Sequence, residues 1–139
     1  MFVLDASALA KSFLDEPRSD ALRAWLGNAV AAGHDLHVPS LAASEIARII
    51  QKERPELDVA AHKELWRAVL LGIHVAPVDM AHDGVWDTAA AGLSYYDAEY
   101  VDLARRLGAT LVTADAAQVR AAAALGIDVL ELVPGAGAA

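Results

Sequence analysis

Two aspartates stand just after short apolar segments of the sequence. Asp5 ends the segment FVLD, and Asp115 follows the segment TLVT after one alanine. Short continuous apolar runs are typical of buried parallel strands, and ligands of open α/β sheets bind at the carboxyl ends of such strands. The two carboxylates are therefore candidate ligands for a cation, although each could instead cap the helix that follows it.

A third acid, Glu45, lies in a predicted helix over residues 41–53. At about 100° per residue, Glu45 is roughly 40° from Ile49, on the shoulder of the apolar helix face. A solvated glutamate would more often lie on the opposite face. Glu45 is therefore a further candidate ligand, or else a boundary residue whose carboxylate reaches water.

The fourth acid, Asp97, lies near the start of a predicted helix over residues 95–107. It shares a helix face with Val101, and this face should point inward. The alternative is a capping role together with Ser94. Glu99 and Asp102 lie roughly 200° and 140° around the helix from Asp97, so both are predicted to be solvated.

Four carboxylates in one dry pocket would repel one another, and a divalent cation would relieve that repulsion. Oxygen ligands favour Mg²⁺, with Mn²⁺ able to substitute, and the absence of cysteine excludes zinc–thiolate sites. Ser7 and Thr113 each lie two residues from an aspartate, and their hydroxyl groups could orient Asp5 and Asp115. Such a site suits phosphodiester hydrolysis, which needs an activated water and neutralised phosphate charge.

The elements that must position these acids alternate along the chain between strands and helices, which predicts an α/β domain with a parallel sheet. We expect one domain over residues 1–133 and a flexible tail over residues 134–139. Ser19 and Asp58 are candidate helix caps. The predicted strands cover residues 2–5, 36–40, 73–78, 110–113 and 127–132, and the predicted helices cover residues 7–14, 19–30, 41–53, 58–71, 80–91, 95–107 and 116–125.

The composition indicates a globular protein with a sizeable core. Hydrophobic residues make up 56% of the 139 residues, and the mean hydropathy is +0.34. No apolar run reaches the roughly 18 residues that a membrane-spanning helix needs, and MFVLD lacks the basic start of a signal peptide, so a cytoplasmic protein is expected. The net charge of −8 argues against broad binding to phosphate backbones unless bound cations reverse the charge locally.

Three basic residues lie near the candidate ligands in the sequence. Lys11 follows Asp5 by six residues, and Arg48 and Lys52 share the predicted helix of Glu45. They are candidates for contacting an RNA backbone, although each could instead be an ordinary solubilising charge.

Three stretches of the sequence resemble the PIN-domain ribonucleases, and among these the VapC-type toxins of toxin–antitoxin pairs. They are VLDASALAKSFLDEP at the start, SLAASEI in the middle and LSYYDAEYVDLARRLGATLVTAD near the end. The resemblance extends from Phe2 to about Leu132. It departs from the common pattern after the last acid, where Ala116, Ala117 and Gln118 stand in place of basic residues.

The resemblance implies a five-stranded parallel α/β/α sandwich and an acidic Mg²⁺ pocket to which Asp5, Glu45, Asp97 and Asp115 correspond. It also implies endoribonuclease activity on single-stranded RNA, inhibition by a cognate antitoxin, and homodimers. Two other hypotheses stay open: a PIN-like module that binds a protein partner without catalysis, and a phosphatase with an aspartyl nucleophile at Asp5. The second is disfavoured because Ser7 stands where such enzymes commonly carry another acid.

Overall fold

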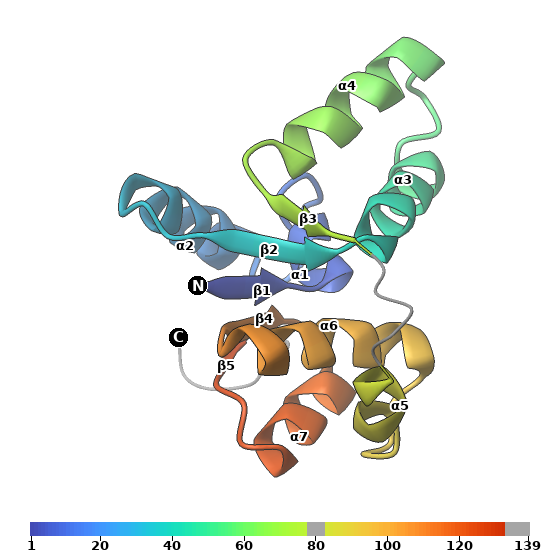
Figure 1. Ribbon diagram of the computed structural model, residues 1–139. Helices are drawn as coiled ribbons and strands as arrows, with labels where there is room; N and C mark the ends of the chain where they lie inside the picture. Colours follow the sequence, from blue (N-terminus) through green and yellow to red (C-terminus); the bar gives the residue numbers. More distant parts are fainter. Residues whose placement is uncertain (78–82, 133–139) are drawn as a thin grey trace.

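Five parallel strands form one sheet in the computed structural model, which describes residues 1–77 and 83–132. The strands are β1 (Phe2–Leu4), β2 (Leu36–Pro39), β3 (His74–Ala76), β4 (Thr110–Thr113) and β5 (Val129–Glu131). Their order in the sheet is β3-β2-β1-β4-β5, and every pairing is parallel. Helices flank this sheet (Figure 1), so the predicted α/β class and the five-stranded parallel sheet are confirmed.

The described residues form seven helices between and around the strands. They are α1 (Ala6–Ala10), α2 (Ser19–Ala31), α3 (Leu41–Glu53), α4 (Val59–Leu70), α5 (Gly84–Ala89), α6 (Tyr95–Leu107) and α7 (Ala116–Ala124). The largest differences from the prediction are at α1, which ends at Ala10 instead of residue 14, and at α5. Of the helix expected over 80–91, only Gly84–Ala89 is helical among the described residues. Residues 80–82 and the predicted tail over 134–139 lie outside the described residues.

The centre of the sheet is fully buried. Val3 of β1 pairs with His37 of β2 on one side and with Leu111 of β4 on the other. Val3 and Leu111 are both 0% exposed, which explains why these strands show continuous rather than alternating hydrophobicity. Helix α6 packs against β1, β2 and β4 and places Val101 in the core.

The order of the strands creates a switch point between β1 and β4. From β1 the chain proceeds to β2 and β3 on one side, whereas β4 and β5 lie on the other side. The loops that leave the carboxyl ends of β1 and β4 therefore diverge, and crevices for ligands form at such positions in open α/β sheets. The backbone N–H of Asp5 donates to the carbonyl of Val112 at 3.0 Å, which joins the two strand ends.

The predicted helix ends are partly confirmed. Asp58 caps α4 by accepting from the backbone N–H of Ala61 at 2.8 Å, and Gly108 ends α6 with φ of 62°. The prediction that Ser19 caps α2 is wrong, because Ser19 is already helical. Its hydroxyl instead accepts from the N–H of Glu16 and donates to the carbonyl of Leu14, and these bonds fix the preceding turn.

Helix α4 contributes less to the core than the other long helices. It has no buried residue and runs beside α3 away from the sheet (Figure 1). Its apolar side is only partly covered, and the indole N–H of Trp66 donates to the carbonyl of Ala43 at 2.8 Å. No helix among the described residues has both the length and the apolar character needed to cross a bilayer.

Candidate metal centre at the carboxyl edge of the sheet

Asp5 leaves the carboxyl end of β1 and is 4% exposed. Its carboxylate caps α1 by accepting from the backbone N–H of Ala8 at 2.9 Å, and the Ser7 hydroxyl donates to its two oxygens at 2.7 and 2.9 Å. Burial raises the pKa of Asp5 from 3.8 to about 6; the bonds from Ser7 and Ala8 oppose this rise, and nearby Asp115 adds to it. The cap and the candidate ligand are therefore the same side chain.

Asp115 occupies the equivalent position after β4 and caps α7. Its carboxylate accepts from the backbone N–H groups of Ala117 at 2.8 Å and Gln118 at 3.2 Å. The Ser7 hydroxyl also accepts from the N–H of Ala114 at 3.2 Å. Ser7 thus connects the loop of Asp5 to the loop of Asp115, beyond the orienting role that the sequence predicted for it.

Thr113 supports the same loop from a buried position at the end of β4. Its side-chain oxygen accepts from the backbone N–H of Asp115 at 3.0 Å, and its hydroxyl donates to the amide oxygen of Gln118 at 2.7 Å. The Gln118 amide in turn donates to the backbone carbonyl of Asp97 at 3.4 Å. Gln118 therefore links the β4–α7 loop to the helix turn that carries Asp97.

Asp97 lies in the first turn of α6 and is partly exposed. Its backbone N–H donates to the hydroxyl of Ser94 at 3.2 Å, so the predicted cap by Ser94 is present. Burial raises the pKa of the Asp97 carboxyl, Asp115 raises it further, and Ser94 opposes the shift. Asp97 is therefore close enough to Asp115 for the two carboxylates to interact electrostatically.

Glu45 approaches the same edge from α3. Its Oε1 accepts from the hydroxyl of Tyr100 at 3.0 Å, across the interface between α3 and α6. Burial raises the pKa of Glu45 and Asp97 adds to the rise, whereas Tyr100 and Arg48 lower it. Tyr100 is 1% exposed and lies close enough to Asp5, Glu45 and Asp97 for all three to raise its own pKa.

The electrostatic interactions thus connect all four acids. Asp115 raises the pKa of both Asp5 and Asp97, and Asp97 raises the pKa of Glu45. Among the described residues, no three acidic or histidine side chains converge closely enough to form a ready metal cage. The chemical type of these donors suits a hard cation such as Mg²⁺, because clustered carboxylate oxygens gain from a nearby positive charge. Waters on such a cation commonly complete its coordination.

The predicted basic residues have different surroundings. Lys11 is 4% exposed, and its ammonium donates to the carbonyl of Pro17 at 2.8 Å, so it supports the turn after α1. Arg48 and Lys52 are exposed on α3. Of the three, only Arg48 acts on a candidate ligand, by lowering the pKa of Glu45.

The prediction that Asp102 is solvated is wrong. Asp102 is 0% exposed, because α5 packs over the α6 face that the sequence pattern assigned to water. Its carboxylate accepts from Arg105 at 2.5 Å, from Arg106 at 2.9 Å and from the hydroxyl of Thr88 at 3.3 Å. Glu99 is partly exposed. Partial burial raises the pKa of its carboxyl group, and the nearby charge of Glu45 raises it further.

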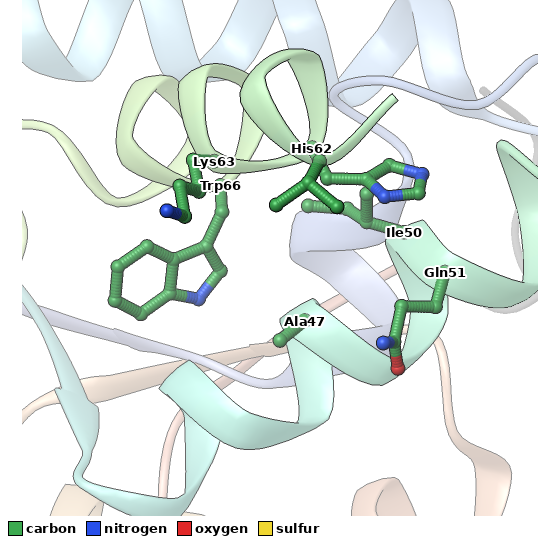
Figure 2. Close-up of a pocket in the computed structure, with 7 residues that line it drawn as sticks. Ala47, Ile50, Gln51, His62, Lys63 and Trp66 are labelled. Atoms are coloured by element: carbon green, nitrogen blue, oxygen red, sulfur yellow. The ribbon is translucent and has the colours of Figure 1, made fainter. Parts of the chain in front are cut away.

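Two hollows on the surface differ in their relation to the acids. One lies between α1 and α3, has a volume of about 370 Å³, and is lined in part by Ser7 and Ala114. It therefore opens beside the hydroxyl that joins the two aspartate loops. The other is an apolar groove of about 290 Å³ between α3 and α4, where Trp66 of α4 points toward Ala47 of α3 (Figure 2). No acid lines this second groove.

Tyr100 and Gln118 contact residues of the candidate metal centre but were not predicted from the sequence to belong to it. Tyr100 lies three residues after Asp97, so helix periodicity puts both on one face. Gln118 lies three residues after Asp115, in the first turn of the helix that Asp115 caps. In both cases the spacing was visible, but the partner, Glu45 or Thr113, lies on another element.

Comparisons with known proteins identify the family of the chain. The PIN domain matches residues 2–124 of the chain. Ribonuclease VapC9 of Mycobacterium tuberculosis is 37% identical over 120 residues, which cover 83% of this chain and 86% of the relative. Ribonuclease VapC3 of Pyrobaculum aerophilum is 34% identical over 120 residues, which cover 81% and 88%.

Two solved structures share the fold. PAE2754 from Pyrobaculum aerophilum has a TM-score of 0.68 at 25% identity and covers 94% of this chain and 83% of its own. FitAB bound to a DNA fragment gives a TM-score of 0.68 at 16% identity, with 94% of each chain covered. The sequence match over residues 2–124 shows that the chain belongs to the PIN-domain family, in which its sequence relatives are VapC ribonucleases.

Proposed function

We propose that this chain is an Mg²⁺-dependent endoribonuclease of the VapC type, acting in the cytoplasm and neutralised by a cognate antitoxin. The observation that carries the proposal is Asp5, a 4% exposed carboxylate beside Asp115 at the switch point of the sheet. An acid in this position gains from a divalent cation, and nucleases of the PIN-domain family are metal-dependent.

The four acids would hold the cation in unequal ways. Asp5 and Asp97 would be the main ligands, and Glu45 and Asp115 would complete the site directly or through bound water. A bound cation supplies a more acidic water and neutralises charge on the phosphate. Ser7 and Thr113 would keep the two strand-end carboxylates in place through the bonds described above. Mn²⁺ would substitute for Mg²⁺ because it prefers the same oxygen ligands.

RNA would approach an edge that is acidic until a cation binds. Arg48 and Lys52 are the better candidates for backbone contacts, because both are exposed on the helix of Glu45. Lys11 is the weaker candidate, since its ammonium is already bonded to the carbonyl of Pro17. The names of the ribonuclease relatives support RNA as the substrate.

The protein partners are part of the same proposal. We expect a homodimer and an antitoxin complex, in line with the VapC resemblance. The apolar groove between α3 and α4 and the exposed side chains of Trp86 and Tyr96, each 68% exposed, support binding to other protein surfaces. A monomer mass by light scattering at micromolar concentration would contradict the dimer.

Cleavage of a single-stranded RNA tests the activity. Wild-type protein should cut with Mg²⁺ and stop on addition of EDTA, and Asp97→Asn should lose at least about 100-fold, since even residues that only orient ligands cost about 10- to 100-fold. Asp128→Asn is the matched control, because Asp128 is exposed at the amino end of β5. Equal cleavage by all three proteins, with or without EDTA, would refute the proposal.

The same purified proteins separate the two rival hypotheses. A catalytically silent PIN-like module would bind a partner protein but show no Mg²⁺ binding by calorimetry. A phosphatase would form a trapped phospho-aspartate on Asp5 with a phosphomonoester substrate. We expect Mg²⁺ binding and no phosphorylated Asp5.

A further inference from the structure

Tyr100 is the largest fully buried side chain of the described residues, with 1% exposure. It lies on α6 three residues after Asp97, and its hydroxyl donates to Oε1 of Glu45 on α3 at 3.0 Å. This bond joins two helices whose residues are 55 positions apart in the chain. It is a direct side-chain contact between the helix of Asp97 and the helix of Glu45.

The hydroxyl group, rather than the ring, distinguishes Tyr100 from an ordinary residue of the apolar core. A phenylalanine would fill the same apolar space, whereas a buried hydroxyl without a partner costs roughly 1–3 kcal/mol. The partner that offsets this cost for Tyr100 is the carboxylate of Glu45. The tyrosine is therefore matched to an acid of the candidate metal centre rather than to the apolar core alone.

The hydroxyl lies among three of the four candidate ligands, because Glu45, Asp5 and Asp97 all act on it electrostatically. In the contact with Glu45 the carboxylate accepts and the hydroxyl is the donor.

Arg48 is a second residue that can attract the carboxylate of Glu45, in a different direction from Tyr100. Arg48 lies three residues later on α3, is exposed, and interacts electrostatically with Glu45. A glutamate side chain has several rotatable bonds, and fixing them costs up to about 2 kcal/mol of entropy. Without the hydroxyl, the carboxylate would be free to turn outward toward Arg48 and water.

We propose that Tyr100 is a positioning residue that holds Oε1 of Glu45 by a hydrogen bond and so keeps this carboxylate at the candidate metal centre. The inference rests on the proposed function, because it assigns Glu45 to the metal centre. It adds that α6 supplies both a ligand, Asp97, and the group that orients a ligand on α3.

Calorimetric titration with Mg²⁺ alone tests this role. Tyr100→Phe removes one oxygen, retains the ring in the core and should fold normally by circular dichroism. Its Mg²⁺ affinity should fall by about 10- to 100-fold, the usual effect of removing a group that orients a ligand. At saturating Mg²⁺ the KM for RNA should stay unchanged. Tyr95→Phe, an exposed tyrosine on the same helix, should differ from wild type by less than about twofold.

A double-mutant cycle with Glu45→Gln separates positioning from a general packing effect. If Tyr100 acts through Glu45, Tyr100→Phe should cause no further loss of Mg²⁺ affinity once Glu45 is glutamine. Wild-type affinity in Tyr100→Phe, or a full additional loss in the double variant, would overturn the inference while wild-type cleavage and Mg²⁺ binding stand. Failure of wild-type protein to bind Mg²⁺ and cut RNA would instead reject the proposed function, and this inference with it.

Discussion

Asp5 and Asp102 are both buried aspartates, with exposures of 4% and 0%, but their surroundings differ in charge. Asp102 accepts from the two guanidinium groups of Arg105 and Arg106, which follow it on the same helix. Asp5 accepts from the Ser7 hydroxyl and the backbone N–H of Ala8; Thr113 also lowers its pKa, whereas its acidic neighbour Asp115 raises it. No basic side chain among the described residues forms an ion pair with Asp5.

The contrast separates a structural acid from a candidate ligand. At Asp102 the chain supplies the compensating cations itself, and the carboxylate helps to hold α5 on α6 through Thr88. At Asp5 the burial cost is offset only in part by hydrogen bonds, which is why its pKa is about 6. A buried carboxylate with this imbalance would be stabilised by an external cation, which a bound metal ion would supply under the proposed function.

The largest expected effect is on RNA cleavage. Asp5→Asn should lose at least about 100-fold in single-turnover rate, because it removes a ligand rather than a group that orients one. Asp102→Asn should stay within about threefold of wild type once unfolded protein is accounted for, since it lies outside the acid cluster. If both variants lose the same amount of cleavage activity at matched folded fractions, Asp5 and Asp102 do not differ in function.

The next effect is a pH dependence of stability in the metal-free protein. Below pH 3.8 Asp5 is protonated in both the folded and the unfolded protein. Between pH 3.8 and about 6, Asp5 ionises only in the unfolded chain, so the free energy of unfolding falls as the pH rises. Above pH 6 the loss is constant, and the difference in pKa corresponds to about 3 kcal/mol. Urea denaturation in EDTA across this range, with Asp5→Asn as reference, isolates the contribution. If the difference in unfolding free energy between wild type and Asp5→Asn does not change with pH, this prediction is wrong.

A smaller effect is expected at the structural acid. Asp102→Asn should lower the free energy of unfolding by about 2 kcal/mol, because hydrogen bonds to charged groups contribute roughly 1.5–3 kcal/mol. The loss stays moderate since the side chains of Arg105 and Arg106 are 42% and 37% exposed and regain water. Denaturant titration at pH 7.5 measures it. No change in stability would show that the buried ion pairs are dispensable.

The smallest effect concerns the exposed cations near the site. Arg48→Ala should raise the KM for RNA a few-fold and lower the slope of log affinity against log salt by about 0.7, the value for one contact to a single strand. Lys63→Ala, an exposed lysine on α4, is the control. An unchanged salt slope in Arg48→Ala would assign Arg48 to solubility alone.

The sequence predicted the fold and the positions of the strand-end acids well, for local reasons. Continuous apolar runs identify central parallel strands, and the residues after them must lie at one edge of the sheet. Asp5 and Asp115 follow from that rule, and both also proved to be helix caps, so the two interpretations of each residue were compatible.

The sequence could not reveal contacts made between distant elements. Asp102 was assigned to water because nothing in the helix pattern of residues 95–107 indicates that α5 covers that face. Lys11 was only a candidate for contacting RNA, and its bond to the carbonyl of Pro17 could not be foreseen because it depends on the path of the following turn. The pairing of Tyr100 with Glu45 likewise depends on how α6 packs on α3.

The most direct test of the contrast is one denaturation experiment with Asp5→Asn and Asp102→Asn at pH 7.5 in EDTA. Asp5→Asn should be more stable than wild type by up to about 3 kcal/mol, because asparagine retains the cap without the buried charge. Asp102→Asn should be less stable, and added Mg²⁺ should stabilise wild type and Asp102→Asn but not Asp5→Asn. If both substitutions destabilise the protein and Mg²⁺ stabilises neither wild type nor variants, Asp5 is a structural acid like Asp102.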